Sequence, residues 1–438
     1  MKKLSLLFAA IAVFVSFNLR AEVAEIGSAE ELAAAIAANP AGDYKLTADI
    51  DCSGWTTCDF SGTLDGNGKT ISGLTTPLFG TVSGNATIKN LVVSGASVAT
   101  ETEDIGIVSM TMADGAFVVQ NISFVNCSLS VKNKTGGMVV AKLTTATTAL
   151  LSNCSMDDSC KVTVRAGAYV GGLFGSVTAN GDGAEVTISN CVSRGTLTIN
   201  DWTNQGAGIV NGIYPKMAKY TNHAYVNVYD CTNYMSATAN GANGNLGGVV
   251  RYAEGGTDSI NGNIRIARCV NFGNLTVKSP ASETGGIISG IKNCGAEIID
   301  CVNYGNISHT GGSKAAGGVV GSVNNIIKDS FVMTGCANLG SVTGTDAGGL
   351  IGDISQSSCT GYTIRSSFNR GTITNSRDGF LPGQAIGYLK STVAYPSIEI
   401  SGSVFMSDTI IGGMIAGASI TDARKESGWI FSDGYFSA

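Results

Sequence analysis

Hydrophobic residues in this chain come in short stretches separated by small and polar residues, and one such stretch recurs. AGGVVGSV at 316–323 reappears as VGGLFGSV at 170–177, TGGIISGI at 284–291 and AGGLIGDI at 347–354. Short runs rich in Val and Ile and bounded by Gly are typical of buried β-strands. The pattern therefore predicts many short strands arranged in a repeating unit.

The repeat has a measurable period. Successive Gly-Gly-like pairs are separated by 29 to 40 residues, and the second positions of the pairs are Pro77, Gly106, Gly137, Gly172, Gly208, Gly248, Gly286, Gly318, Gly349, Gln384 and Gly413. A second phrase runs in step with the first, because Cys191, Cys231, Cys269 and Cys301 each lie 17 residues before the next of these positions. A period of roughly 20 to 50 residues is the signature of solenoids and related repeat folds.

One unit is predicted to hold three short strands separated by turns. In residues 296–323 the strands would be AEIIDCV, GNISH and AGGVVGSV, with Asn-Tyr-Gly and Thr-Gly-Gly at the corners. Strands this short become stable only when copies stack and pair their backbones, and crossovers between parallel strands are right-handed. We therefore predict an all-β fold, a right-handed parallel β-helix of the pectin-lyase-like type with roughly eleven coils, one per pair position. The Gly pair is expected to turn the backbone tightly, so that the next residue fills the core.

The segments outside the repeats suggest a leader and two caps. Residues 1–21 combine two lysines, an apolar run and a small final residue, which is typical of an export signal. Within 22–44, SAEEL predicts a capping box from Ser28 to Glu31 that opens an Ala-rich helix ending near Ala38 and covering the first coil. The β-helix is assigned to 45–424. Residues 425–438 are assigned to a C-terminal aromatic cap, with a secretion signal as the alternative; the aromatic residues are Trp429, Phe431, Tyr435 and Phe436.

Composition and charge reduce the number of functions that this chain can have. The 438 residues include 59 Gly and 6 Pro but only 14% charged residues, which is unlike a typical α/β enzyme. Removal of residues 1–21 takes away three of the 27 basic residues, so 24 remain against 33 acidic ones. Such a surface repels phosphate backbones, and nucleic acid is not an expected partner. No transmembrane segment is expected in the mature chain, which is predicted to be extracellular or at the cell surface, with the periplasm as an alternative.

Four stretches of the sequence carry a resemblance to a known family. GGLFG at 171–175 and GGLIG at 348–352 resemble the Glug repeat, a Gly-Leu-any-Gly motif of exported bacterial proteins, many of them adhesin-like. LTADIDCSGW at 46–55 and FSGTLDGNGKTISGL at 60–74 are similar to the coils that precede such repeats. The resemblance covers most of residues 45–415. It implies a β-helix architecture but no single activity, because the repeat accompanies different activities, including some peptidases.

Most of the cysteines are expected to pack inside the core as free thiols. An exported chain with 12 cysteines ordinarily suggests disulfides, but their register predicts one internal column of free thiols. Cys52 and Cys58 are a separate pair that either closes a short loop or remains reduced, and the states of Cys160, Cys294 and Cys359 stay open. The predicted column contains Cys127, Cys154, Cys191, Cys231, Cys269, Cys301 and Cys336, with Ser367 next.

The search for reactive groups yields no catalytic residue, metal site or cofactor. The two histidines, His223 and His309, are far apart in register, and the adjacent pair Asp157 and Asp158 is interpreted as a solvated turn. DGNG at 65–68 lacks the later acidic ligands of a calcium loop and is also interpreted as a turn.

One long interval is richer in side chains that bind ligands. Between Gly208 and Gly248 the stretch 213–230 alternates tyrosines with basic residues, and aromatic rings beside hydrogen-bond donors suit sugars. The alternative is that these tyrosines pack their own loop. The candidate binding residues are Trp202, Tyr214, Lys216, Lys219, Tyr220, His223 and Tyr225.

Three functions fit the sequence. The first is an exported, non-catalytic β-helix, adhesin-like or glycan-binding, whose partner is a glycan or another host or cell-surface ligand. The second is a polysaccharide lyase or hydrolase whose carboxylates converge only in the fold. The third is a structural component of an envelope or matrix. We expect the first, and hence that the chain is not an enzyme.

Overall fold

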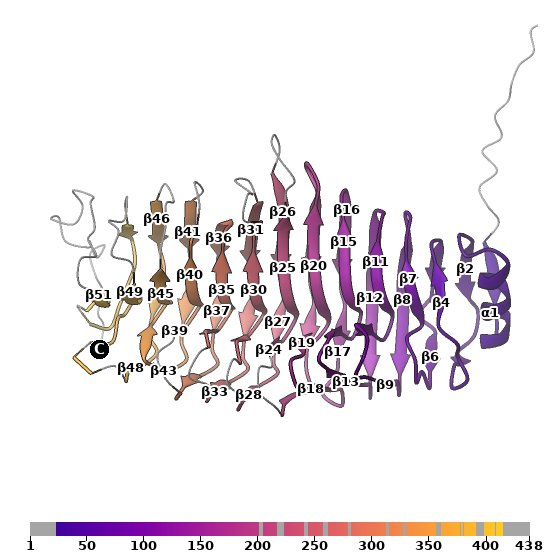
Figure 1. Cartoon of the computed structure of the whole chain (residues 1–438), viewed down its shortest axis with the longest axis horizontal. Coiled ribbons are helices and arrows are strands. Elements are labelled where there is room, and N and C mark those ends of the chain that lie inside the picture. Colours follow the sequence, from indigo (N-terminus) through magenta and orange to yellow (C-terminus); the bar gives the residue numbers. More distant parts are fainter. Residues whose placement is uncertain are drawn as a thin grey trace, which may run out of the picture.

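The computed structural model forms a long rod in which β-strands stack side by side (Figure 1). It describes residues 23–200, 205–216, 223–240, 244–256, 262–278, 282–311, 315–326, 330–355, 361–376, 378–379, 381–390, 398–407 and 409–414. The predicted signal peptide and C-terminal aromatic cap lie outside these residues. The strands run across the rod and pair in parallel, so the prediction of a parallel β-helix is confirmed.

Within the described residues, four sheets, which we name A to D, form the walls of the helix. Sheet A receives two strands from most coils, and its 22 strands are β1 (Ala24–Ile26), β2 (Asp43–Leu46), β3 (Ile50–Asp51), β5 (Thr63–Asp65), β6 (Thr70–Ser72), β8 (Thr87–Ser94), β12 (Phe117–Val125), β16 (Thr148–Ser152), β17 (Ser155–Met156), β21 (Glu185–Ser189), β22 (Val192–Ser193), β26 (Ala224–Tyr229), β27 (Thr232–Asn233), β31 (Gly262–Ala267), β32 (Val270–Asn271), β36 (Gly295–Ile299), β37 (Val302–Asn303), β41 (Ser330–Thr334), β42 (Ala337–Asn338), β46 (Gly361–Arg365), β47 (Phe368–Asn369) and β50 (Ile398–Ser401).

The other three sheets receive one strand per coil. Sheet B contains β4 (Cys58–Phe60), β7 (Phe79–Val82), β11 (Ser109–Ala113), β15 (Val140–Thr145), β20 (Phe174–Asn180), β25 (Val210–Lys216), β30 (Val250–Glu254), β35 (Ile288–Lys292), β40 (Val320–Asn324), β45 (Ile351–Ser355), β49 (Ile386–Leu389) and β51 (Ile411–Met414). Sheet C contains β9 (Ser97–Thr100), β13 (Ser128–Lys132), β18 (Lys161–Arg165), β23 (Thr196–Ile199), β28 (Ala237–Ala239), β33 (Leu275–Val277), β38 (Ile307–His309), β43 (Val342–Gly344) and β48 (Ile373–Asn375). Sheet D contains β10 (Ile105–Gly106), β14 (Thr135–Gly137), β19 (Tyr169–Gly171), β24 (Gln205–Ala207), β29 (Leu246–Gly247), β34 (Thr284–Gly285), β39 (Ala315–Gly317) and β44 (Asp346–Gly348).

The stack is about one coil longer than the sequence predicted. Over the described residues, sheet B has twelve strands, against the eleven pair positions counted in the sequence. The additional strand is β4, which precedes Pro77, the first of those positions.

Two of the three strands predicted for one coil are each divided in two, AEIIDCV and AGGVVGSV, whereas GNISH contains the single strand β38. The predicted strand AEIIDCV becomes β36 and β37 because Asp300 between them has a left-handed backbone with φ of 51°. The same bend recurs in neighbouring coils, where φ lies between 48° and 55° at Asn153, Asn190, Asp230, Arg268 and Ser366. Asn and Asp tolerate this conformation better than most residues. One left-handed residue per coil therefore turns the chain within sheet A.

The Gly pair is required for close packing between coils and not, as we expected, for a tight turn. The second Gly does not adopt a left-handed backbone; at Gly318 an added Cβ would lie 2.1 Å from the Gly349 carbonyl oxygen and 2.3 Å from the Asn338 side chain. A Cβ added at Gly286 would likewise collide with the Gly318 carbonyl oxygen and the Asn303 side chain. Only a residue without a side chain fits there. The repeat is therefore a consequence of close packing inside the helix rather than of a tight turn.

The side chains that fill this space form a buried asparagine ladder. Each amide Nδ2 donates to the Oδ1 of the next coil and to a backbone carbonyl two residues along its own chain; for Asn303 these distances are 2.8 Å to Asn338 and 2.8 Å to Gly305. The last amide donates to Gln384. A buried amide needs such partners, and a complete ladder therefore fixes the coil-to-coil register. The ladder contains Asn233, Asn271, Asn303, Asn338 and Asn369, each at most 1% exposed.

A column of thiols lies two residues earlier in each coil. The backbone carbonyl of each column cysteine accepts a hydrogen bond from the next coil. The Val270 N–H donates to the Cys231 carbonyl, and the Val302 N–H donates to the Cys269 carbonyl. Burial raises the pKa of the thiols of Cys191, Cys231, Cys269 and Cys336, which keeps them neutral. The structure places Cys154, Cys191, Cys231, Cys269, Cys301 and Cys336 in this column, and Ser367 follows them.

Cys127 lies outside this column, contrary to our expectation. Ser123 pairs with Ser155, so Ile122 occupies the position level with Cys154. Cys127 follows the end of β12 at the next corner, where its backbone N–H donates to the Cys160 thiol at 3.5 Å. The bend of this coil is at Asn121, with φ of 56°, so Ile122 takes the column position and Cys127 lies five residues later, level with Cys160.

The helix α1 (Ala29–Ala38) caps the N-terminal end of the rod (Figure 1). The Ser28 hydroxyl accepts from the Glu31 N–H at 3.2 Å, and the Glu31 carboxylate accepts from the Gly27 N–H at 2.7 Å. Leu32 and Ile36 face the core. The predicted capping helix is therefore confirmed. Among the described residues, no helix has the length and apolarity needed to cross a membrane.

We predict that Asn303→Ala lowers the free energy of unfolding by about 1–3 kcal/mol, because the Asn271 amide loses one of its two acceptors and the Asn338 and Gly305 oxygens lose their donor inside the core. Chemical denaturation followed by circular dichroism measures the change. Asn240→Ala, at an exposed position, is the matched control and should leave stability within the error of the measurement. Equal effects of the two substitutions would contradict the role of the ladder.

Alkylation of native protein should distinguish the two kinds of cysteine. Cys58 is partly exposed and its pKa is raised to about 11, so it should react with iodoacetamide slowly and faster at higher pH. The column thiols should react only after denaturation. Mass spectrometry of tryptic peptides locates the label. Labelling of Cys231 in folded protein would contradict this burial.

Candidate functional site

The predicted binding residues lie on two separate walls. Tyr214 and Lys216 belong to β25 in sheet B, and the Lys216 ammonium lies 5.3 Å from the Tyr214 ring centre. Tyr225 belongs to β26 in sheet A, with the His223 ring 5.8 Å away and the Arg265 guanidinium 4.9 Å from its ring centre. Trp202, Lys219 and Tyr220 lie outside the described residues. The described members of the predicted site are therefore two pairs on different faces.

Tyr214 takes part in packing around a buried arginine. Arg251 is 6% exposed, donates from Nε to the Asn211 side chain at 3.2 Å, and lies 3.5 Å from the Tyr214 hydroxyl. The rings of Tyr169 and Tyr252 lie 5.5 and 4.9 Å from its guanidinium carbon. These contacts agree with the alternative interpretation of the sequence, in which the tyrosines pack against the protein itself instead of binding a ligand.

The structure instead brings together a second set of aromatic residues, which we call the aromatic ladder. The rings of Tyr234, Phe272 and Tyr304 stack in parallel, with centres 4.9 and 4.8 Å apart and planes within 9° of each other. Their exposed fractions are 40%, 43% and 48%, so all three are open to a ligand. The Arg194 guanidinium covers the free face of Tyr234 at 4.0 Å.

The rigid backbone of the coils holds this ladder in place. Thr232, Val270 and Val302 pair in register between adjacent strands. Each of these strands ends at a buried asparagine, and the ring of the ladder belongs to the next residue. Phe272 is covered on both faces by its neighbours, and Tyr234 lies between Phe272 and Arg194, so the ladder presents mainly ring edges and two phenolic hydroxyls. The result is an apolar ribbon that runs along the rod axis.

The sequence contains a signal for the aromatic ladder. The signal is the constant spacing of its residues from the column cysteines and not a local concentration of aromatic residues. Tyr234, Phe272 and Tyr304 each lie three residues after a column cysteine, in the phrases CTNYM, CVNFG and CVNYG. Residues at equal distances from a repeat position must stack on one another. The local concentration of tyrosines at 213–230, on which the predicted site was based, is therefore a weaker guide than this spacing.

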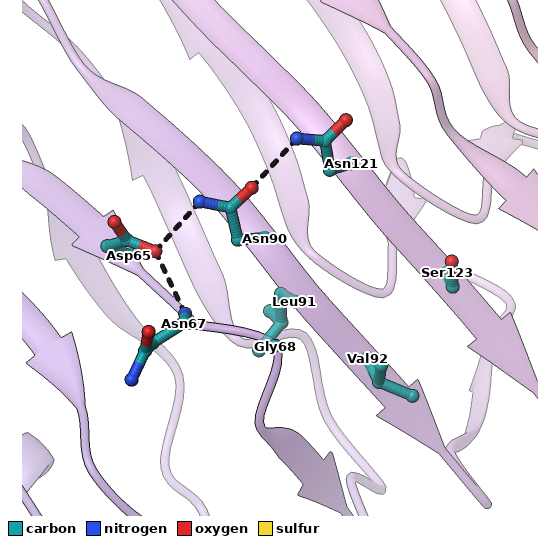
Figure 2. Close-up of a pocket in the computed structure, with 8 residues that line it drawn as sticks. All are labelled: Asp65, Asn67, Gly68, Asn90, Leu91, Val92, Asn121 and Ser123. Atoms are coloured by element: carbon teal, nitrogen blue, oxygen red, sulfur yellow. Dashed lines mark hydrogen bonds between the residues drawn. The ribbon is translucent and has the colours of Figure 1, made fainter.

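A second feature is an open pocket at the N-terminal part of the rod (Figure 2). Its volume is about 410 Å³, and Asp65 forms its charged part. Asp65 Oδ1 accepts from the Asn67 N–H at 2.8 Å and from the Asn90 amide at 3.0 Å, and the Asn90 amide oxygen accepts from Asn121 at 2.8 Å. The predicted DGNG turn therefore forms one side of this pocket.

The Asp65 carboxylate is held in its charged form. Burial alone would raise its pKa, but the hydrogen bonds from Asn90 and Asn67 and the Lys89 ammonium at 3.4 Å lower the pKa below its usual value. A carboxylate with these partners is poorly suited to donate a proton near neutral pH. The pocket thus offers hydrogen-bonding groups rather than an acid catalyst.

Comparison with known proteins gives one family match. Residues 13–125, about a quarter of the chain, match the model of the M26 IgA1-specific metallo-endopeptidase N-terminal region. The pocket lies within this stretch. Among solved structures, a protein from Bacteroides ovatus described as a candidate immunoglobulin A1 protease aligns with a TM-score of 0.35 and 19% identity, covering 64% of this chain and 78% of that one. No curated protein matches the chain.

The family match contradicts our expectation that the chain is not an enzyme. The matched model describes the N-terminal region of a metallo-endopeptidase family, and this match overturns that expectation. The sequence patterns did not reveal this match because the matched stretch contains strands and turns rather than a catalytic motif.

The residues that the structure describes do not fit the metal of a metallo-endopeptidase. Within the described ranges, no three His, Cys, Asp or Glu side chains gather in a way that would hold a metal ion. The sequence has two histidines, and neither belongs to a His-Glu-x-x-His motif. His309 is 2% exposed on β38, whereas His223 precedes β26 at an exposed position. We therefore derive no catalytic step through a metal.

We predict that Asp65→Asn lowers stability at neutral pH and that its effect disappears in acid. The folded-state pKa of Asp65 is lowered, so its stabilising effect is present above the pKa of the unfolded state and is lost as the pH falls through the lower folded-state value. Denaturation midpoints of both proteins from neutral to acid pH measure this. A difference between the two proteins that stays constant with pH would contradict the assignment.

Proposed function

We propose that this chain is an exported, Glug-like β-helix protein of the bacterial surface that binds glycans through the aromatic ladder, including glycans carried by proteins. The observation that carries the proposal is the stack of three rings, each at least 40% exposed. Contiguous exposed aromatic residues on an otherwise well-packed protein mark interaction sites. The ladder lies on a rigid scaffold, so little ordering is required when a ligand binds.

Sugars suit this surface for two reasons. Apolar C–H groups of a sugar ring can contact the ribbon of ring edges, and the hydroxyls of Tyr234 and Tyr304 can both donate and accept hydrogen bonds. The surrounding residues supply further polar groups, since Ser236, Asn274 and Asn306 are exposed two positions beyond the rings. A ligand with alternating apolar and hydroxyl-bearing faces therefore meets complementary groups.

A second proposal is that the protein acts in peptide-bond hydrolysis. It is supported by the match of residues 13–125 to the N-terminal region of a metallo-endopeptidase family. The two proposals are compatible, because a surface that holds the glycan of a glycoprotein also brings its polypeptide close to a peptidase. Incubation of residues 22–438 with a glycoprotein such as mucin, followed by mass spectrometry, tests it. On this proposal new peptides appear, and they are absent when the protein is left out; a spectrum without new peptides would contradict it.

For the first proposal, we predict that Phe272→Ala weakens glycan binding by about tenfold, which corresponds to about 1.4 kcal/mol for the central ring of the ladder. Binding is measured by isothermal titration calorimetry with the best ligand from a glycan array. Since the ring is exposed, the unfolding midpoint should change little.

Tyr225→Ala serves as the matched control, because Tyr225 is an aromatic residue on the outer face of sheet A that belongs to the site predicted from the sequence. It should leave binding unchanged. If Tyr225→Ala removes binding and Phe272→Ala does not, the ligand binds at the residues predicted from the sequence instead of the aromatic ladder.

A further inference from the structure

The outer face of sheet C carries a continuous column of hydroxyl groups beside the aromatic ladder. Strand pairing places one Ser or Thr from each of eight successive coils in register. Their neighbours in sequence, such as Leu197 and Ile199, are buried, so the hydroxyl-bearing side chains point outward. The column contains Ser130, Thr163, Thr198, Thr238, Thr276, Ser308, Thr343 and Thr374, and we call it the hydroxyl column.

A column of amides and hydroxyls lies between the hydroxyl column and the aromatic ladder. The Asn306 backbone N–H donates to Asn274 Oδ1 at 2.8 Å, and the Ser341 N–H and hydroxyl both donate to Asn306 Oδ1, at 3.0 and 2.8 Å. The Ser236 hydroxyl accepts from the Asn274 N–H at 2.9 Å. These bonds occupy the amide oxygens and fix the side chains, so the amide Nδ2 groups remain as outward donors.

The charge of this wall differs from that of the chain. In the part of the chain that the structure describes, the nine strands of sheet C contain no Asp or Glu, although the chain has 33 acidic residues. Their charged side chains are Lys132, Lys161 and Arg165, and Arg194 lies at one end of the aromatic ladder. The wall is therefore neutral to slightly basic, and it is rich in groups that both donate and accept hydrogen bonds.

We infer that the ligand is an extended glycan chain that lies along the rod axis, with its sugars contacting the hydroxyl column and the aromatic ladder at once. The inference rests on the proposed function, and it adds the shape and direction of the ligand. Adjacent groups in each column repeat at the spacing of paired strands, about 4.8 Å, so seven steps extend over roughly 34 Å. A polymer of sugars presents hydroxyls repeatedly over such a length, whereas a single sugar can use only one or two coils.

The repetition predicts that affinity depends on ligand length. Each added sugar that contacts a further coil binds at high effective concentration, because the previous sugars already hold the chain in place. The hydroxyls are held by a paired backbone, so this gain is not offset by ordering of the protein. A hexasaccharide should therefore bind at least tenfold more tightly than the disaccharide of the same series.

The test uses residues 22–438 with cello-, xylo-, manno- and chito-oligosaccharides, each as disaccharide, tetrasaccharide and hexasaccharide, titrated by calorimetry. The triple variant Thr238→Val, Thr276→Val and Thr343→Val removes three hydroxyls from the column while preserving side-chain shape. We expect it to weaken hexasaccharide binding about tenfold and to leave disaccharide binding almost unchanged. The control variant Thr187→Val with Thr363→Val changes the outer face of sheet A in the same way and should bind like wild type.

The outcomes separate the inference from the proposed function. If Phe272→Ala weakens binding but affinity is the same for all lengths or unchanged in the triple variant, the glycan site stands and the axial chain is wrong. If no oligosaccharide in the panel or on the array binds, both are wrong. If the triple variant instead abolishes a dimer of wild-type protein seen by analytical ultracentrifugation, the face binds a second copy, and the inference is overturned. Circular dichroism confirms that each variant is folded.

Discussion

In-register pairing of parallel strands is the constraint on which the rest of this protein depends. Each coil contributes strands of two to nine residues, which are too short to be stable alone, and the next coil satisfies their backbone groups. A shift of one residue would turn every buried side chain outward, so the register must be fixed at each step. From Asn233 to Asn369 the buried asparagine ladder fixes it, since the amide of Asn303 can reach Asn338 and Gly305 together in only one alignment.

The same register explains both the repeated sequence and the surface. Inside the helix, the asparagine ladder leaves no room for a side chain on Gly286 or Gly318, which is why the Gly pair recurs. Outside, equal register turns any residue repeated between coils into a row along the rod. The aromatic ladder and the hydroxyl column are two such rows, and they lie side by side because they occupy the corner and the wall that follow the same cysteine.

The family match and the surface describe different parts of the rod. The matched residues 13–125 include the capping helix, the first coils and the pocket at Asp65, whereas the aromatic ladder lies in later coils. A repeat scaffold can combine such separate features because each coil contacts mainly its neighbours. The matched stretch and the aromatic ladder are therefore structurally independent, and each can be altered without rebuilding the other.

The sequence by itself determined the architecture and the position of the capping helix, because period, strand composition and the Ser28–Glu31 capping pattern are local properties. It also determined which cysteines share a column wherever the spacing was constant, and it failed at Cys127, which lies one corner later than the column, level with Cys160. Only the tertiary structure decided which outward side chains meet. Tyr214 and Tyr225 are close in sequence but lie on different walls, whereas Tyr234 and Tyr304 are 70 residues apart in numbering and belong to one stack. The physical reason is that a coil brings together residues one full turn apart, so contact depends on register rather than on distance along the chain.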